Sequence, residues 1–200
     1  MYIYIFIFIA SLIIGKVLNK LIDNISYSIS KCDKKTFSAY IPIICVVAFE
    51  ILFFKFGLTI LLAKAIVMTT ILIIISFIDL RHRIIPDFIV ALALVSGIIF
   101  SILVRASFLD TILGMIAGGG ILLLLSFIPN AMGGGDIKLM FAIGAFLGVN
   151  RTLWALLLAF LLSSIVSITL IFFKIKGTKD YIPFGPFLAL GSFMSMIIFV

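Results

Sequence analysis

The sequence predicts an all-α fold, a polytopic membrane helix bundle of about eight transmembrane helices that forms one domain over residues 1–200. Composition is the first reason. Hydrophobic residues make up 64% of the chain and charged residues 12%, whereas soluble domains are about half apolar and a quarter charged. Patterning is the second reason, because the apolar residues gather in long runs that suit a bilayer, where lipid-facing side chains need no water.

Each expected helix is an apolar run of roughly the 20 residues that a membrane crossing needs. The second and third runs are broken only by Lys55, Gly57 and Lys64. The sixth is short and contains glycine, so it need not cross the bilayer on its own. The first run has no basic segment before it, which favours a retained helix over a cleaved signal peptide. The eight runs are residues 1–19, 40–57, 59–78, 88–104, 109–128, 136–149, 151–173 and 184–200.

The longest polar stretch, about residues 19–38, is too short for a hydrophobic core of its own, so we expect no separate soluble domain. The two cysteines are Cys32, in this stretch, and Cys45, inside an apolar run. Because they form neither a CxxC pair nor a disulfide pattern, we expect two free thiols.

Basic residues predict the orientation. Eight spans put eleven Lys and Arg residues on one side and four on the other, and the positive-inside rule assigns the richer side to the cytoplasm and both termini to the outside. In a soluble protein the net charge of +7 would suggest nucleic acid. Here the charges flank membrane runs, so we expect membrane lipid and no nucleic acid as a partner. The four residues on the outer side are Lys55, Lys64, Arg105 and Arg151.

Two acids stand out among the eight in the chain. Asp79 closes one apolar run and Asp136 opens another, so both are expected at cytoplasmic helix ends at similar depth. Charges at membrane depth are costly and tend to be functional. Two carboxylates that meet can act as an aspartyl protease, in which one activates water and the other, protonated, donates to the scissile carbonyl. The plainer interpretation is that Asp136 is a helix cap after a glycine turn.

Glycines precede Asp136 at positions 133, 134 and 135. Without side chains, Gly133 and Gly135 can take positive φ and let another chain approach closely, which leaves room for an extended substrate strand. A phosphate cradle is the alternative, but the following Asp136 would repel phosphate and the P-loop pattern is absent.

Five segments, in order along the chain, resemble the type IV prepilin leader peptidases, a family of GxGD membrane aspartyl proteases. The Gly-x-Gly-Asp signature alone is weak, but the ordered set is specific and covers nearly the whole chain. The segments are Gly15-x-x-Leu18-Asn19, Ile41-Pro42-Ile43, residues 77–87, Gly133-Gly134-Gly135-Asp136-Ile137-Lys138, and residues 182–189 with Gly191.

The resemblance implies that Asp79 and Asp136 are the catalytic pair. The implied substrates are type IV prepilin or pseudopilin precursors, whose short basic leader is removed just before a hydrophobic helix. The reaction is expected at the cytoplasmic face of the bacterial cytoplasmic membrane. The sequence does not say which precursor is cut, whether it serves a pilus, a secretion machine or a competence system, or what the oligomeric state is.

Five residues are named beside the catalytic pair. Gly133 and Gly135 would shape the substrate groove, with Lys138, Pro86 and Asp87 as support. Asp87, which follows Pro86, is most simply the N-cap of the fourth helix.

Proteolysis by two carboxylates needs no cofactor. Many bacterial members carry two CxxC pairs that bind zinc, and methylate the new N-terminus with S-adenosylmethionine. Here Cys32 stands alone in the corresponding loop, which excludes a four-cysteine site, and we expect no zinc or other metal. Methylation, and with it S-adenosylmethionine, stays open.

Two rival functions remain at this stage. One is another GxGD protease with a different membrane substrate. The other is a proton-coupled transporter that relays protons through paired acids. A transporter would more naturally hold its acids at mid-membrane and often has inverted repeats, neither of which the sequence indicates.

Overall fold

The computed structural model describes residues 2–30, 40–128, 132–175, 177 and 182–199. These residues form eight helices and no strands, which confirms the all-helical prediction. The helices are α1 (Tyr2–Ser30), α2 (Tyr40–Phe56), α3 (Ile60–His82), α4 (Asp87–Leu103), α5 (Phe108–Ser126), α6 (Gly134–Leu147), α7 (Val149–Phe172) and α8 (Gly185–Ile198).

Helices α1, α3, α5 and α7 are long and apolar enough to cross a membrane, and α4 and α8 are shorter apolar helices. The chain is therefore an integral membrane protein. Helix α6, with 14 residues, is about 21 Å long and shorter than a bilayer core. It is nonetheless buried along most of its length, which agrees with the expectation that it need not cross alone.

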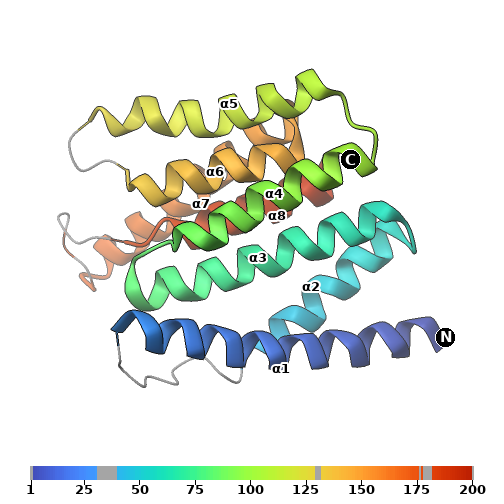
Figure 1. Cartoon of the computed structure of the whole chain (residues 1–200). Coiled ribbons are helices and arrows are strands. Elements are labelled where there is room, and N and C mark those ends of the chain that lie inside the picture. Colours follow the sequence, from blue (N-terminus) through green and yellow to red (C-terminus); the bar gives the residue numbers. More distant parts are fainter. Residues whose placement is uncertain (1, 31–39, 129–131, 176, 178–181, 200) are drawn as a thin grey trace.

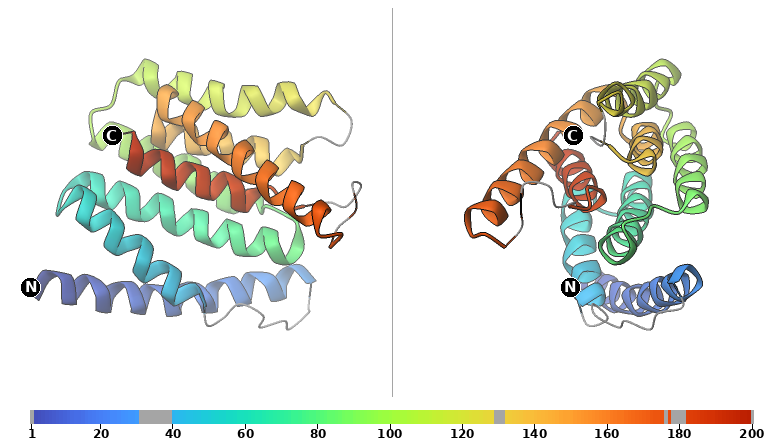
Figure 2. Two further views of the ribbon diagram at one scale, coloured as in Figure 1. Left: turned by 180° about the vertical axis from the view of Figure 1, so that it is seen from behind. Right: turned by 90° about the vertical axis from the view of Figure 1, so that its left-hand side faces the viewer.

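The helices run up and down, so successive connections alternate between the two ends of the bundle (Figure 1). The N- and C-terminal ends lie at the same end as the α2–α3 turn and the α4–α5 connection. The α3–α4 connection and the starts of α6 and α8 lie at the opposite end (Figures 1 and 2). This is the alternation that the count of eight runs predicted.

Helix α1 runs eleven residues beyond its predicted end at residue 19, so the first part of the polar stretch at residues 19–38 is helical. The reason is a buried face that repeats with helical spacing through Leu18, Ile22 and Ser26. In addition, Arg81 of α3 donates from Nη1 to Asp23 Oδ1 at 2.7 Å, which ties this extension to the bundle. Cys32 and the rest of residues 31–39 lie outside the described residues.

Two other boundaries have clear local causes. Gly57 has φ +57°, a left-handed conformation that separates α2 from α3. The N-cap of α4 is Pro86, and Asp87 is the first helical residue, so the prediction of Asp87 as the N-cap was wrong. Proline has no N–H to satisfy and its fixed φ suits a helix start. Cys45 is a buried free thiol in α2, as expected.

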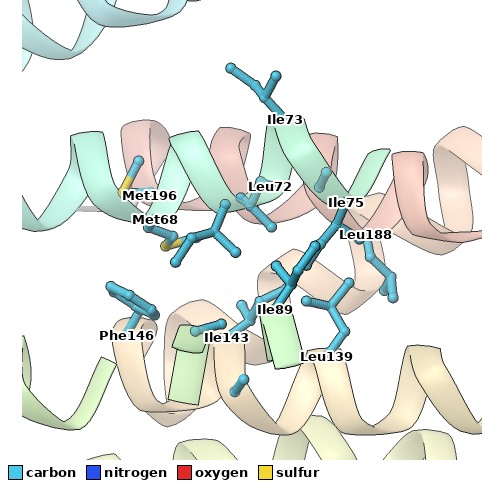
Figure 3. Packing of buried hydrophobic residues seen from close by; sticks show 14 of the residues in the cluster. Met68, Leu72, Ile73, Ile75, Ile89, Leu139, Ile143, Phe146, Leu188 and Met196 are labelled. Carbon is cyan, nitrogen blue, oxygen red and sulfur yellow. The ribbon is translucent and has the colours of Figure 1, made fainter. Parts of the chain in front are cut away.

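The core lies where α3, α6 and α8 meet inside the bundle, with the other helices around them (Figure 2). Side chains of all three helices, joined by Ile89 of α4, interlock there (Figure 3). They include Met68, Leu72 and Ile75 of α3, Leu139 and Ile143 of α6, and Leu188 and Met196 of α8. This core packs α3 against α8 and joins both helices to α6 through buried side chains.

Helices α5 and α6 pack closely because glycines face the contact. A Cβ built on Gly118 would lie 2.5 Å from the Met140 carbonyl oxygen, and one on Gly119 would lie 2.9 Å from Phe141 Cβ. Gly120 differs, since its nearest neighbour beyond its own helix backbone would be Ile116 Cγ2 at 3.9 Å. Close packing therefore depends on the first two glycines and not on the third.

We predict that Gly118→Ala destabilises the bundle by about 1–3 kcal/mol, because the added methyl group meets the α6 backbone. Gly120→Ala is the matched control on the same helix. It should be neutral or slightly stabilising, because alanine favours a helix and the space is open. Thermal unfolding of the purified proteins in detergent measures both, and equal midpoints for the two variants would contradict the packing argument.

Candidate active site

Asp79 and Asp136 come together at one end of the bundle. Asp79 lies in the last turn of α3 and Asp136 in the first turn of α6, and their exposures are 5% and 6%. Both line a cavity of about 240 Å³, and Asp79 is close enough to act electrostatically on Asp136. The other lining residues are Arg83, Ile84, Ile85, Asp87, Gly133, Gly134, Gly135 and Phe184.

The end of α3 is shaped by Arg83. This residue takes the left-handed conformation with φ 56°, and its N–H donates to the Asp79 carbonyl oxygen at 2.8 Å. The helix stops there, and the chain turns through residues 84–86 into α4. Asp79 is thereby held in the final helical turn, with the turn itself forming one wall of the cavity.

The start of α8 holds the Asp79 carboxylate. The Gly185 N–H donates to Asp79 Oδ2 at 2.9 Å, in a buried position. A Cβ on Gly185 would lie 2.7 Å from the same oxygen, so a side chain cannot fit without a shift. Sequence analysis assigned no role to Gly185, although it lay within the segment at residues 182–189. Its position just before Pro186, a residue that favours the start of a helix, was the available sign that α8 begins at Gly185.

Asp136 has a different environment. Its backbone N–H bonds to the Gly133 carbonyl oxygen at 3.1 Å, and Gly133 is the N-cap of α6. Asp136 is the third residue of α6 and not its N-cap, so the interpretation of Asp136 as a helix cap is wrong. Its Oδ1 is buried and has no hydrogen-bond partner among the described residues. A buried carboxylate oxygen is costly without a partner, so this atom calls for water, a proton or a bound ligand.

The glycines beside Asp136 do not take positive φ. Gly133 is extended, at φ −79° and ψ 142°, and Gly134 and Gly135 belong to the first turn of α6. The expected close approach does occur at Gly135, where a Cβ would lie 3.0 Å from Ile85 Cβ. A Cβ on Gly134 would meet nothing within 4 Å, so open space adjoins the acid.

The three other residues named from the sequence lie at the rim or outside the cavity. Asp87 lines its edge. Lys138 donates to Asp87 Oδ1 at 2.8 Å, and both side chains are exposed, so this ion pair links α6 to α4 with little energetic weight. Pro86 begins α4 and does not line the cavity.

Within the part of the chain that the structure describes, no group of three or more His, Cys, Asp and Glu side chains is placed to hold a metal ion. The described site therefore consists of two buried carboxylates, the Gly185 N–H, and a wall on which Arg83 and Asp87 accompany glycines and apolar side chains. Such a site can bind and polarise a water molecule between its acids.

Residues 66–170, more than half of the chain, match the model of the type IV leader peptidase family. This chain belongs to that family. The matched segment runs from α3 into α7 and contains both Asp79 and Asp136, while α8 lies outside it. The resemblance drawn from the ordered motifs is thereby confirmed.

Several family members share substantial identity with this chain. It is 32% identical to the prepilin leader peptidase/N-methyltransferase of Aeromonas hydrophila over 140 residues. This aligned segment covers 66% of this chain and 48% of the relative. The protein of the same name from Legionella pneumophila is 36% identical over 155 residues, which cover 70% of this chain and 52% of the relative. The protein of that name from Bacillus subtilis is 28% identical over 152 residues, which cover 72% of this chain and 58% of the relative.

The chain spans about half the length of these relatives. No solved structure matches it significantly.

Proposed function

We propose that this protein is a membrane aspartyl endopeptidase that removes the leader of type IV prepilin-like precursors, with Asp79 and Asp136 as its catalytic residues. One observation carries the proposal: two buried carboxylates, delivered by separate helices, line a single cavity. The family match and the relatives named prepilin leader peptidase support the choice of substrate.

The chemistry follows from the two acids. The ionised carboxylate takes a proton from a water molecule as the water oxygen attacks the scissile carbonyl carbon. The protonated carboxylic acid donates to the carbonyl oxygen, because two close carboxylates do not readily ionise together. Collapse of the intermediate then breaks the C–N bond. The carboxyl group that took the water proton passes it to the leaving nitrogen, and the other carboxylate regains its proton from a hydroxyl group of the intermediate.

Gly185 has a positioning role in this scheme. Its N–H occupies Asp79 Oδ2, which leaves Oδ1 for the water and fixes the plane of the carboxylate. The unpartnered Oδ1 of Asp136 is the second atom available to the water or to the substrate carbonyl.

An apolar groove between α2, α3 and α8, of about 420 Å³, suits the hydrophobic helix of the precursor. Its lining includes Leu80 and Pro186, which directly follow Asp79 and Gly185 in the sequence, so one end of the groove lies at the end of the bundle that carries the two aspartates. It follows α3 from Thr69 to Leu80, about 16 Å, which accommodates about three turns of a helix.

A second apolar groove, between α4, α5 and α6, also reaches the cavity rim. The ion pair of Lys138 with Asp87 stands at that junction. The described residues that line the groove between α2, α3 and α8 include no charged side chain, so we assign the precursor's hydrophobic helix to this groove.

The site is proposed to face the cytoplasm. The bundle end that carries Asp79 and Asp136 is the end to which the sequence assigns eleven of the fifteen basic residues, and the positive-inside rule puts that end in the cytoplasm. A bacterial cytoplasmic membrane is the matching location. A transporter is not favoured, because both acids lie at helix ends and not near helix middles.

N-methylation, the second activity in the relatives' name, is not part of this proposal. The described residues offer no observation that identifies a site for S-adenosylmethionine, and Cys32 lies outside them. The mass of the processed N-terminus reports methylation separately.

We predict that Asp79→Asn and Asp136→Asn each reduce leader removal by about 10²- to 10⁴-fold, the usual contribution of a general acid or base. The measurement is co-expression with a prepilin precursor, followed by gel shift and N-terminal mass. Asp110→Asn, in α5 at the other end of the bundle, is the control and should cleave normally. Full cleavage by either dyad variant, with the protein folded, would rule out the assigned chemistry.

Gly185→Ala should slow cleavage by about 10²-fold, because the methyl group displaces the Asp79 carboxylate and misplacement of about 1 Å can cost that much. Gly120→Ala, which adds a methyl group in open space, should leave the rate unchanged. Thermal midpoints of both variants separate a local effect from unfolding. Equal rates for the two variants would remove Gly185 from the mechanism.

Filling the groove tests the precursor's position. Val47→Trp, at a site 54% exposed in the α2–α3–α8 groove, should raise KM for a precursor with its full hydrophobic helix. Leu123→Trp, 51% exposed in the α4–α5–α6 groove, should leave KM unchanged. The reverse pattern would assign the precursor to the other groove.

A further inference from the structure

A second polar cavity, of about 540 Å³, lies at the end of the bundle opposite the two aspartates. Lys64 lines it, and this residue is 15 positions before Asp79 on α3, which places the two sites about 22 Å apart along the helix. The polar and charged side chains on its wall are Lys64, Ser101, Asp110, Thr111, Asn150 and Arg151.

The wall of this cavity carries two cations and one acid. The acid, Asp110, is already engaged: its Oδ1 accepts the Val149 N–H at 3.0 Å, and its other oxygen lies against Gly148. Asp110 thereby accepts a hydrogen bond from the first residue of α7, where a negative charge interacts favourably with the helix dipole. Ser101 and Thr111 hydrogen-bond each other at 2.5 Å and so are also engaged.

Neither cation forms an ion pair with a described acid. Among the described residues the ion pairs are Arg81 with Asp23 and Lys138 with Asp87, so neither Lys64 nor Arg151 is paired. Lys64 also makes no hydrogen bond to them. It lies close enough to Arg151 and Asp110 to interact electrostatically with both.

Arg151 is held in place from two directions. Its Nε donates to the Phe199 carbonyl oxygen at 2.8 Å, and its own carbonyl oxygen accepts Ser195 Oγ at 2.6 Å. These bonds position the guanidinium on the cavity wall without neutralising its charge. An ordered arginine beside an unpaired lysine is a favourable arrangement for an anion with several oxygens.

We propose that this cavity binds an oxyanion of the phosphate class through Lys64 and Arg151. Two sources share that chemistry, free phosphate and the headgroup of an anionic phospholipid. The site is independent of the proposed peptidase activity. Trp154 stacks on Phe199 at the cavity wall, with ring centroids 4.4 Å apart, and is 43% exposed, as aromatic residues at a membrane interface often are.

The chain provides its own probe, because Trp154 is its single tryptophan and lines the cavity. Its fluorescence is recorded while purified protein is titrated with inorganic phosphate in detergent. In a second arm the protein is placed in bilayers of phosphatidylcholine with increasing phosphatidylglycerol. A response in the first arm indicates free phosphate, and a response in the second alone indicates the lipid headgroup.

Three charge variants and one control variant test the assignment. Lys64→Gln should weaken binding about 10- to 100-fold, the usual contribution of a charged hydrogen bond. Asp110→Asn should tighten it, because the amide oxygen still accepts the Val149 N–H while the acid among the described lining residues is lost. Lys55→Gln, an exposed lysine at the same end of the bundle, is the matched control and should bind normally. Arg151→Gln should behave like Lys64→Gln and replaces it if that variant does not fold.

The decisive result is that Lys64→Gln and Asp110→Asn change the anion affinity in opposite directions. The proposal is overturned if neither arm gives a response, if Lys64→Gln and Arg151→Gln bind as wild type, or if Asp110→Asn weakens binding. The last result would mean that Lys64 and Asp110 simply neutralise each other. Cleavage by Lys64→Gln should equal that of wild type, so failure here leaves the peptidase proposal intact.

Discussion

The hydrogen bond from the Gly185 N–H to Asp79 is the contact on which the arrangement of the site depends. It joins two residues 106 positions apart and requires that α8 begin directly against the last turn of α3. The shared core of α3, α6 and α8 keeps that geometry, and the same core brings the first turn of α6 alongside. A buried carboxylate is costly without a donor, so the packing of three helices and the chemistry of one acid are linked.

The bundle has polar groups concentrated at its two ends, and the ends differ. At one, two buried acids share a cavity with Arg83, Asp87 and apolar side chains. At the other, two cations share a cavity with an acid already occupied by a helix start. The apolar middle separates these sites, which is why substitutions in one are expected to leave the other unaffected.

Apolar runs predicted all eight helices, because membrane helices need long uninterrupted hydrophobic stretches that few other structures tolerate. The end of α1 was missed because residues 20–30 contain polar side chains, and only their helical spacing revealed a buried face. The meeting of Asp79 with Asp136 followed from their places at helix ends. Gly185 could not be predicted, since a backbone N–H leaves no mark in a sequence, and neither could the conformation of Gly133.

The position of Gly185 has a consequence for biosynthesis. During translation, the acids of α3 and α6 enter the membrane before α8 exists, so they meet without the amide that orients one of them. A nascent chain interrupted before α8 would contain both carboxylates but would lack the Gly185 N–H that binds Asp79. In the proposed peptidase, the site therefore reaches the geometry described above only when α8 inserts against α3 and α6.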